Sequence, residues 1–358
     1  MMTKDPLPPR KDIPSYWRDQ SDDTAWLHLG ENPFQPTPHV LKAIWKAAES
    51  SNRYPDTNAL ELRRKLAEYV GNGLTEKNII IGNGSDDLID LVIVTFTTPA
   101  DMVATFEPSF FVYHFASQRH RVSVLPIPRD TSFNLPDSLN LIQKQQPIGL
   151  SFIDNPNNPT GVITARTHLL EFINTLPGIV VVDECYYEFS GETLVDQVFE
   201  NKRLIIFRSL SKSFGLSGLR LGYAVAHEEL IEQMARYALT FPVNALAQAA
   251  GIAALEDVRS YRERIQNIIQ WRNELSHQLE NAGVQVLPSH TNFILALFPP
   301  STRNPAQFLA QHNLLVSDQT TAIGKGVPAI RIAVGQPEEN VKVLETVKQY
   351  LQEEKSLT

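Results

Sequence analysis

The chain has 358 residues, of which 42% are apolar and 20% charged, and its 32 basic and 40 acidic side chains give a formal charge of −8. This length favours two domains, and the charge argues against general binding to nucleic acid or to an anionic membrane. Cys185 is the one cysteine, so an internal disulfide and a zinc site built from several thiolates are both excluded, and no metal site is predicted.

The segment 1–20 is rich in proline and charge and is expected to form a flexible N-terminal arm. It lacks the apolar core of a signal peptide, and no apolar run approaches the ~20 residues of a membrane helix. We therefore expect a cytoplasmic protein. A helix is predicted over 39–49, and a second helix follows Asp56 or Thr57, either of which could cap it.

The middle of the chain alternates short apolar segments with helical patterns. Predicted strands cover 78–81, 102–106, 123–127, 149–153, 179–182, 204–209 and 221–226. Their continuous apolarity is typical of a sheet that is covered on both faces, and such sheets are mostly parallel.

The pattern changes after residue 245. Amphipathic helices are predicted over 246–255 and 261–281, followed by strand-like segments at 283–287, 293–297 and 329–334. We predict an α/β fold with a large domain at 51–245. Segments 21–50 and 246–358 are expected to form a smaller α+β domain.

A glycine-rich turn, Gly82-Asn83-Gly84, connects the first of these strands to a predicted helix that begins at Ser85 and Asp86. Free N–H groups of a first helical turn can bind an anion. The structural alternative is that Ser85 and Asp86 only cap the helix. The turn lacks the third glycine of a dinucleotide-binding motif and the Gly-Lys-Ser/Thr of a Walker loop.

The motif NPNNPTG (155–161) directly follows the predicted strand 149–153. Its prolines and glycine are typical of a rigid turn. Ligands bind at the carboxyl ends of parallel strands in open α/β sheets, so an Asn amide held there could contact a ligand oxygen.

Asp183 ends a run of four apolar residues, with Glu184 and Tyr186 close behind. A carboxylate at the tip of a buried strand is costly unless it is paired. One interpretation is an N-cap or an ion pair, with Tyr186 packed in the core. The other is a carboxylate that stays ionised beside a cationic ligand group.

The segment SLSKSFGLSGLRLG (209–222) places Lys212 in a turn between two predicted strands. A lysine in a polar turn is usually solvated. Here Ser209, Ser211 and Arg220 could together bind a phosphate, with Arg220 in bidentate contact. A neutral Lys212 amine beside them could attack a carbonyl.

In this order, these motifs resemble those of the fold-type I aminotransferases that use pyridoxal 5′-phosphate, and in particular the histidinol-phosphate aminotransferase branch. That branch also shows ENPF (31–34), RYPD (53–56), NGSD (83–86) and a late IRIAVG (330–335). The resemblance covers residues 26 to 345. It implies a large domain with a mostly parallel, seven-stranded sheet, a smaller α+β domain and a place in histidine biosynthesis.

The resemblance implies that Lys212 binds the cofactor as an internal aldimine and then moves a proton between substrate and cofactor. Asp183 would accept the N–H of the pyridinium ring, and Asn158 and Tyr186 would donate to the ring hydroxyl oxygen. Phe110 stands where the family stacks an aromatic ring on the cofactor.

The resemblance also assigns the residues that would bind the cofactor phosphate. The cofactor phosphate would lie against Ser85, Asp86, Ser209, Ser211 and Arg220. Tyr54 would reach the phosphate bound by a partner subunit, which implies a homodimer with its active site at the interface.

The amino donor and the 2-oxo acid acceptor would be small molecules, and Arg331, together with Asn158, would bind the substrate. In this assignment the Arg331 guanidinium grips the α-carboxylate in a bidentate contact, a geometry that suits arginine better than lysine.

One segment departs from the family pattern. Relatives in this branch commonly have an arginine where this chain has Ser317, within LLVSDQ (314–319). If that arginine holds the distal phosphate of histidinol phosphate, another cation replaces it here, with Arg119, Arg121, Arg236 and Lys325 as candidates. Otherwise the substrate is not phosphorylated.

The leading hypothesis is amino transfer from histidinol phosphate to 2-oxoglutarate. Aromatic amino acids are alternative donors, and a threonine-phosphate decarboxylase is an alternative enzyme, because the same cofactor can break the Cα–CO₂ bond. A regulator that binds the cofactor without catalysis is a third hypothesis.

Overall fold

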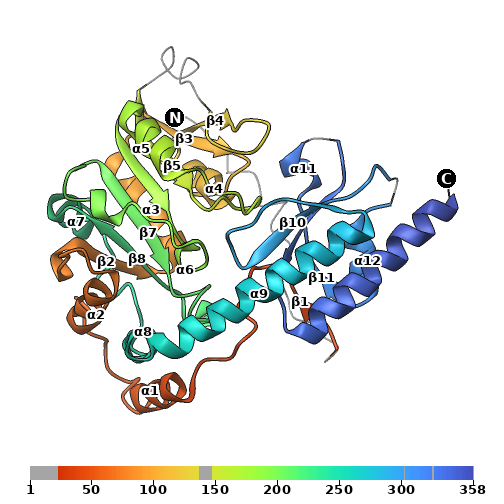
Figure 1. Ribbon diagram of the computed structural model, residues 1–358. Coiled ribbons are helices and arrows are strands. Elements are labelled where there is room, and N and C mark those ends of the chain that lie inside the picture. The colour runs from red at the N-terminus through yellow and green to blue at the C-terminus, as the bar shows by residue number, and fades with distance from the viewer. Residues whose placement is uncertain (1–22, 137–146, 302, 325, 358) are drawn as a thin grey trace, which may run out of the picture.

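The computed structural model describes residues 23–136, 147–301, 303–324 and 326–357, so the expected arm at 1–20 lies outside the described residues. The chain forms two lobes, each around its own β-sheet (Figure 1). The long helix α9 (Val258–Ala282) runs from the larger lobe to the smaller one. In the described ranges, no helix combines the length and apolarity that crossing a bilayer requires.

The larger lobe contains a seven-stranded sheet with the order β2-β8-β7-β6-β5-β3-β4. All of its neighbouring strands are parallel except where β8 pairs with β2 and β7, which confirms the prediction of a mostly parallel sheet. The strands are β2 (Ile79–Asn83), β3 (Met102–Glu107), β4 (Ser123–Pro128), β5 (Ile148–Asp154), β6 (Ile179–Asp183), β7 (Leu204–Ser209) and β8 (Leu221–Ala226).

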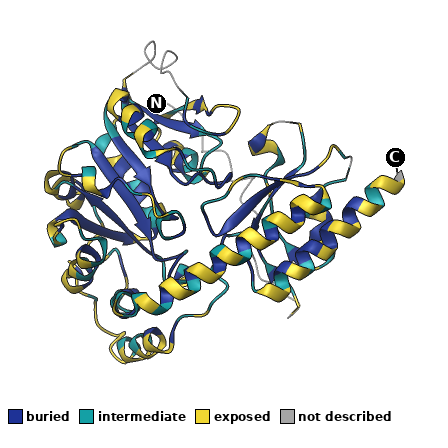
Figure 2. Ribbon diagram, in the orientation of Figure 1, coloured by how far each residue is buried: buried dark blue, intermediate teal, exposed yellow. Residues whose placement is uncertain are grey.

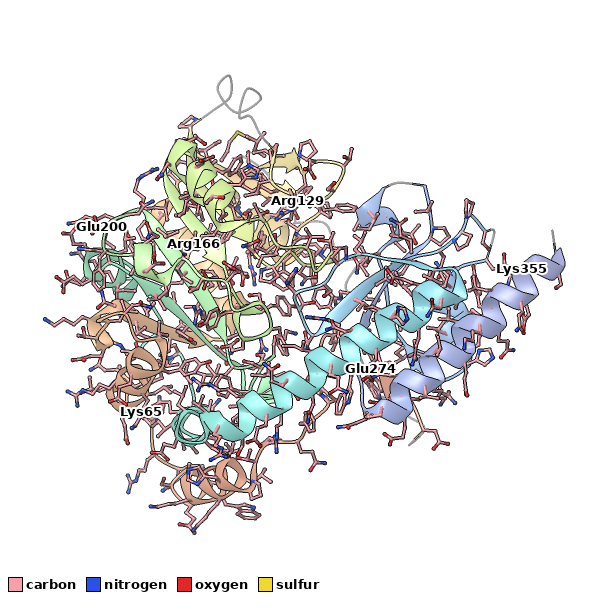
Figure 3. The ribbon with its side chains drawn as sticks, viewed as in Figure 1. Lys65, Arg129, Arg166, Glu200, Glu274 and Lys355 are labelled. Atoms are coloured by element: carbon pink, nitrogen blue, oxygen red, sulfur yellow. The ribbon has the colours of Figure 1, made fainter. Side chains whose placement is uncertain are left out.

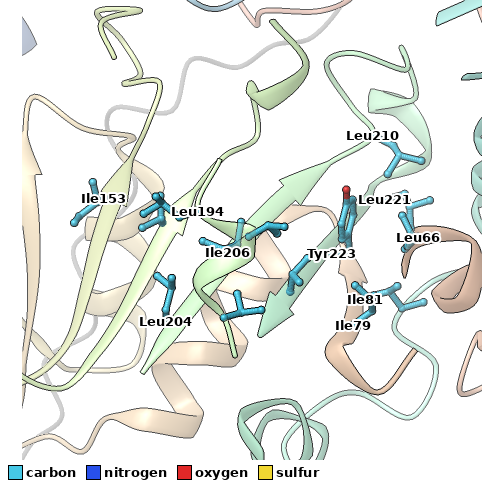
Figure 4. Packing of buried hydrophobic residues seen from close by; sticks show 14 of the residues in the cluster. Leu66, Ile79, Ile81, Ile153, Leu194, Leu204, Ile206, Leu210, Leu221 and Tyr223 are labelled. Carbon is cyan, nitrogen blue, oxygen red and sulfur yellow. The ribbon is translucent and has the colours of Figure 1, made fainter. Parts of the chain in front are cut away.

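Both faces of this sheet are buried, as Figure 2 shows, except along the edge strand β4, where only Ile127 is buried. Neighbouring residues of a strand point to opposite faces, so Val181 and Val182 lie in two different apolar clusters, as do Ile205 and Ile206. Figure 4 shows the cluster that contains Ile206 and Tyr223. Burial on both sides explains why these strands have no alternating polar residues.

Helices cover the two faces separately. The cluster on one face includes residues of α3 (Ser85–Phe96), α4 (Val112–Arg119) and α7 (Glu228–Ala235). The cluster on the other includes residues of α1 (Pro38–Ala48), α2 (Leu60–Val70), α5 (Arg166–Thr175) and α8 (Ala245–Glu256). Shorter helical segments are α6 (Tyr187–Ser190), η1 (Glu76–Asn78), η2 (Val195–Gln197) and η3 (Ser217–Leu219). Helix α2 starts later than predicted, but the Asp56 carboxylate accepts the Leu60 N–H at 2.9 Å.

The smaller lobe contains an antiparallel sheet with the order β12-β13-β10-β9 and a parallel pair, β1 with β11. Its strands are β1 (Ala25–Trp26), β9 (Gln285–Val286), β10 (Phe293–Leu297), β11 (Leu314–Leu315), β12 (Ser317–Asp318) and β13 (Ala329–Ala333). Its helices are α10 (Pro305–Gln311), α11 (Thr320–Ile323) and α12 (Pro337–Leu357).

The apolar clusters show which lobe each segment packs in. Val40 of α1 and Ala250 of α8 belong to the core of the larger lobe, whereas Ala25, Leu27 and Leu275 belong to that of the smaller lobe. The chain therefore passes from the smaller lobe to the larger one between Leu27 and Val40, and returns to the smaller lobe within α9. The domain boundaries at residues 50 and 245 stay a prediction.

Candidate active site

Strands β2, β5, β6 and β7 are among those that end at one edge of the larger sheet, where β8 begins. Asp154 of β5 is the register partner of Asp183 of β6, which in turn is paired with Phe207 of β7. Ser209, at the end of β7, is paired with Gly222 at the start of β8, and Gly222 is paired with Gly82 of β2. Loops that are far apart in the sequence therefore meet at this edge, where α/β sheets bind ligands.

The Asp183 side chain is buried at the centre of this edge. The Tyr113 hydroxyl donates to its Oδ2 at 2.8 Å, and the Cys185 backbone N–H donates to its Oδ1 at 3.0 Å. Burial raises the pKa of the Asp183 carboxyl, while the hydrogen bonds from Cys185 and Tyr113 act in the opposite direction. Both donors are neutral, so a cationic N–H would stabilise this carboxylate further.

Lys212 lies in the turn after β7, and its Nζ faces a loop from the N-terminal part of the chain. The ammonium donates to the carbonyl oxygens of Leu29 at 2.9 Å and Gly30 at 3.1 Å. Desolvation lowers the pKa of Lys212 to about 8, and the positive charge of Arg331 adds to the effect. A substantial neutral fraction is therefore present in mildly alkaline solution, and only the neutral amine attacks a carbonyl.

Asn158 and Arg331 come together across the two lobes. Nη1 of Arg331 donates to Oδ1 of Asn158 at 2.5 Å, and Nη2 donates to the His28 carbonyl at 2.7 Å. The guanidinium also lies over the Phe293 ring, 5.1 Å from its centroid. Tyr186 packs edge-on against that ring with centroids 5.3 Å apart. Burial raises the pKa of the Tyr186 hydroxyl, which therefore stays a hydrogen-bond donor.

The start of α3 forms a cradle with the arginine that follows η3. Gly84 has φ of +82°, and a Cβ on it would lie 2.3 Å from Nη2 of Arg220, so this close approach requires glycine. Arg220 also contacts the Asp86 carboxylate at 3.5 Å. The N-cap residue of α3 is Gly84, which has no side chain to accept a hydrogen bond from the N–H groups of the first turn. The backbone N–H groups of this first turn and the Arg220 guanidinium suit an anion.

Ser209 and Ser211 lie next to this cradle. Ser209 is the sheet partner of Gly222, and Gly222 is so close to the start of α3 that a Cβ added to it would lie 2.8 Å from the Ser85 nitrogen. Both serines are buried, and the Ser211 N–H donates to the Ser209 hydroxyl at 3.1 Å. The sequence-predicted anion-binding residues are thus brought together.

Phe110 lies beside the Asp183 end of the site, since its ring packs edge-on against Tyr113 with centroids 5.6 Å apart. Tyr54 is not brought to the site within this chain. It is 83% exposed and stacks on Phe241 at a centroid distance of 4.6 Å. An exposed position is what a residue needs if it serves a partner subunit.

Several groups that shape the site were not predicted from the sequence. Tyr113 donates to Asp183, and Asn32 of the ENPF motif donates to the carbonyls of Lys212 at 2.8 Å and Ser213 at 3.2 Å. Asp154 accepts N–H groups from two of the site loops. A signal was available for Asp154, because it ends an apolar strand as Asp183 does, whereas nothing in the sequence singled out Tyr113.

The donor set fits pyridoxal 5′-phosphate, the cofactor that the resemblance implies. A lysine with a lowered pKa suits an aldehyde, and the buried Asp183 carboxylate suits a pyridinium N–H. Asn158 and Tyr186 offer polar groups to a ring oxygen, and the cradle at Gly84 and Arg220 suits a phosphate.

Comparisons with known proteins agree with this assignment. The family model "Aminotransferase class I and II" matches residues 22–347. A histidinol-phosphate aminotransferase from Thermoanaerobacter sp. (strain X514) is 38% identical, over 91% of this chain and 92% of its own length. An aromatic amino acid aminotransferase from Nocardia farcinica (strain IFM 10152) is 34% identical, over 93% of this chain and 94% of its own length.

Solved structures share the fold. The crystal structure of the histidinol-phosphate aminotransferase from Clostridium acetobutylicum has a TM-score of 0.81 at 23% identity, over 90% of this chain and 98% of that one. The family model spans most of the sequence, and a relative at 38% identity spans nearly all of it. The chain therefore belongs to the class I and II aminotransferases, and its cofactor is pyridoxal 5′-phosphate.

Proposed function

We propose that this enzyme transfers the amino group of histidinol phosphate to 2-oxoglutarate, as a step of histidine biosynthesis in the cytoplasm. The observation that carries the proposal is the meeting of Lys212, Asp183, Asn158 and Arg331 at one sheet edge, in a chain whose 38% identical relative is named for this reaction. The single, buried cysteine is compatible with a reducing compartment.

Lys212 is proposed to hold the cofactor covalently and then to carry the proton. When bound, pyridoxal 5′-phosphate supplies an electron-withdrawing ring that stabilises negative charge at the substrate Cα. After the substrate has displaced it, the freed Lys212 amine would take the proton from the substrate Cα and deliver it to the cofactor carbon that had carried the aldehyde. A pKa of about 8 suits this task, because a general base works best near the ambient pH.

Asp183 and its neighbours are proposed to orient the ring. The Asp183 carboxylate accepts the ring N–H and keeps the nitrogen protonated, and the Tyr113 hydroxyl fixes the direction of that carboxylate. Asn158 and Tyr186 donate to the ring hydroxyl oxygen, and Phe110 covers one ring face. Oδ1 of Asn158 already accepts from Arg331, so its amide N–H₂ is oriented as the donor.

Arg331 is proposed to bind the substrate α-carboxylate in a bidentate contact, since two of its nitrogens are already oriented by Asn158 and His28. The cofactor phosphate is proposed to lie in the cradle formed by the start of α3 and Arg220, with the hydroxyls of Ser209 and Ser211. These roles place the reacting carbon between Lys212 and Arg331.

A panel of half-reactions tests the proposed function. Purified holoenzyme is mixed in turn with histidinol phosphate, phenylalanine, tyrosine, glutamate and threonine phosphate, and the loss of the visible absorbance of the bound cofactor is timed. The fastest reactions are expected with histidinol phosphate and glutamate, with a keto product and no CO₂. Release of CO₂ from threonine phosphate would show a decarboxylase, and no reaction with any amino donor would show a non-catalytic protein.

A second donor class, the aromatic amino acids, is favoured by one observation. Ser317 of β12 lies directly opposite Arg331 in the antiparallel pair, so a neutral hydroxyl stands beside the proposed carboxylate-binding site. Nε2 of Gln319 donates to this hydroxyl at 2.7 Å. Of the alternative cations, Arg119 is paired with Asp90 at 3.1 Å, and Lys325 lies outside the described residues.

The variant Ser317→Arg is expected to raise kcat/KM for histidinol phosphate by about 10- to 100-fold. A charge-assisted hydrogen bond contributes about 1.5–3 kcal/mol, and each 1.4 kcal/mol is a factor of about ten. In the ligand-free protein the new arginine would face Arg331 and repel it, so the melting temperature should fall and recover when inorganic phosphate is added.

Ser356→Arg, on the exposed end of α12, adds the same charge outside β12 and serves as the control. It should leave kcat/KM for histidinol phosphate unchanged. An unchanged kcat/KM in Ser317→Arg as well would show that position 317 does not govern use of a phosphorylated substrate.

The enzyme is further proposed to act as a homodimer in which Tyr54 reaches the partner's cofactor phosphate. Tyr54 stacks on Phe241, and Leu239 in the same loop is 65% exposed. Trp45, which lies on α1, is also exposed. Large apolar side chains exposed together are typical of a surface that another chain covers.

Leu239→Asp is expected to convert the dimer to a monomer, because it buries a charge in the proposed interface. Sedimentation velocity measures the change, and cofactor affinity should fall in parallel, since the monomer lacks the partner's Tyr54. Phe199→Asp, at an exposed apolar residue elsewhere, is the matched control and should stay dimeric. A Leu239→Asp protein that remains a dimer would place the interface on another surface.

A further inference from the structure

A buried carboxylate that is not assigned to any step of the reaction lies next to Asp183. Asp154 is the last residue of β5 and the register partner of Asp183. Its side chain is 4% exposed, and both of its oxygens are occupied by donors. Oδ1 accepts from Nη2 of Arg129 at 2.7 Å and from the Asn157 amide at 3.0 Å.

The other oxygen of Asp154 binds two backbone N–H groups from two different loops. Oδ2 accepts from the Phe110 N–H at 3.2 Å and from the Asn158 N–H at 3.0 Å. Phe110 follows β3 and Asn158 follows β5, so one carboxylate oxygen ties together the two loops that carry these residues. The Asn157 amide adds a second tie, because it also donates to the Pro108 carbonyl at 2.9 Å.

Arg129, labelled in Figure 3, holds this carboxylate from the side opposite Oδ2. It lies just after β4, and its side chain is 1% exposed. Its Nε donates to the Phe106 carbonyl at 2.9 Å, and Nη2 also donates to the Asp154 carbonyl at 3.2 Å. The guanidinium is thus anchored by backbone oxygens of β3 and β5, which gives the carboxylate a single orientation.

We propose that Asp154, held by Arg129, is a positioning residue that sets the distance between the Phe110 ring and the Asn158 amide at the cofactor site. The inference rests on the proposed function, in which Phe110 covers the ring and Asn158 donates to its hydroxyl oxygen. Asp154 itself touches neither cofactor nor substrate. It acts through the two backbone N–H groups that it holds.

An ionised carboxylate is required for this arrangement. Four N–H donors converge on the two oxygens of Asp154, and a carboxylate has acceptor sites for all of them. An asparagine has one acceptor oxygen, so its N–H₂ group must face either the two backbone donors or the Arg129 guanidinium. In either orientation, N–H groups of the asparagine would face other N–H groups, and their repulsion would move the two loops apart.

The test compares Asp154→Asn with the double variant Asp154→Asn, Arg129→Met. The single variant leaves the buried Arg129 charge without its partner and is the one at risk of not folding. The double variant removes both charges and keeps a side chain of similar length at position 129. Thermal melting and circular dichroism report folding of each variant without the cofactor.

Two measurements follow the cofactor rather than turnover. For both Asp154 variants, the affinity of the apo-enzyme for pyridoxal 5′-phosphate, measured by fluorescence titration, is expected to fall about tenfold or more, because the Asn158 hydrogen bond and the Phe110 ring contact are both weakened. The pH midpoint of the bound cofactor's visible absorbance is expected to rise, because a displaced Asn158 no longer stabilises the charged ring oxygen.

Asp130→Asn is the matched control. The Asp130 carboxylate also accepts two backbone N–H groups, those of Ser132 and Asn134, both at 2.8 Å, but it is exposed. This variant should match the wild type in cofactor affinity and in the absorbance midpoint. A folded double variant that also matches the wild type in both would overturn the positioning role.

Measurements on the wild type distinguish a failure of the proposed function from a failure of the positioning role alone. If the wild-type apo-enzyme fails to bind pyridoxal 5′-phosphate or to react with any amino donor, the proposed function fails. If the wild type binds and reacts while the folded Asp154 variants keep its affinity and midpoint, only the positioning role fails.

Discussion

Lys212→Ala is expected to abolish both half-reactions and to leave the cofactor bound without a covalent link. Loss of the amine that is proposed to transfer the proton should by itself lower the single-turnover rate by about 10²–10⁴-fold. Borohydride reduction followed by mass spectrometry measures the link directly, since it attaches the cofactor permanently to the wild type and should attach nothing at position 212 of the variant. Stopped-flow absorbance with histidinol phosphate measures the rate.

The control is Lys202→Ala, which removes an exposed lysine that pairs with Glu229 at 2.7 Å. It should keep the wild-type rate and the covalent link. In the wild type, capture of the cofactor by the apo-enzyme should accelerate as the pH rises through about 8, because only the neutral Lys212 amine attacks the aldehyde. Wild-type half-reaction rates in Lys212→Ala would refute the role of Lys212.

Asp183→Asn is expected to keep the cofactor bound but to slow proton abstraction by about 10²-fold or more. The proposed phosphate cradle is unchanged in this variant, whereas the ring nitrogen would lose the carboxylate that is proposed to keep it protonated. A hundredfold loss corresponds to about 2.7 kcal/mol in the activation free energy. Cofactor stoichiometry by absorbance and the single-turnover rate by stopped flow separate binding from chemistry.

Asp196→Asn is the matched control, since Asp196 is a more exposed carboxylate that pairs with Arg166 at 2.6 Å. Its single-turnover rate should equal that of the wild type. A wild-type rate in Asp183→Asn would mean that the ring nitrogen does not depend on this carboxylate. Loss of cofactor from Asp183→Asn would instead show that Asp183 contributes mainly to binding.

The strands of the larger sheet were predictable because both faces of the sheet are buried. The predicted segments 204–209 and 221–226 have the observed bounds of β7 and β8. Three other predicted strands stop one residue early, before Glu107, Asp154 and Asp183. The backbone ladder continues through these residues, but their side chains are polar because they lie at the ligand-binding edge. The apolar runs in the sequence therefore end where the candidate site begins.

Much of the candidate site could also be predicted, since its motifs occur in a recognisable order along the chain. Lys212, Asp183, Asn158 and Arg220 were assigned from the segments around them. The contacts among the site residues could not be predicted, because they join distant parts of the sequence. Tyr113 and Asp183 are 70 residues apart, Phe110 and Asp154 are 44 apart, and Lys212 and Leu29 are 183 apart.

The sequence by itself determined the fold class, because the pattern of apolar residues and the turn preferences of neighbouring residues are local features of the chain. The family and the residue types available for the chemistry came from the order of its motifs, which resembles that of a known family. Only the tertiary structure decided how those groups are held: which carbonyls face the Lys212 amine, what fixes the Asp183 carboxylate, and which carboxylate joins the loops of Phe110 and Asn158. Sheet pairing and the packing of the two lobes create these contacts, and no local pattern in the chain specifies a hydrogen bond between loops that meet only after folding.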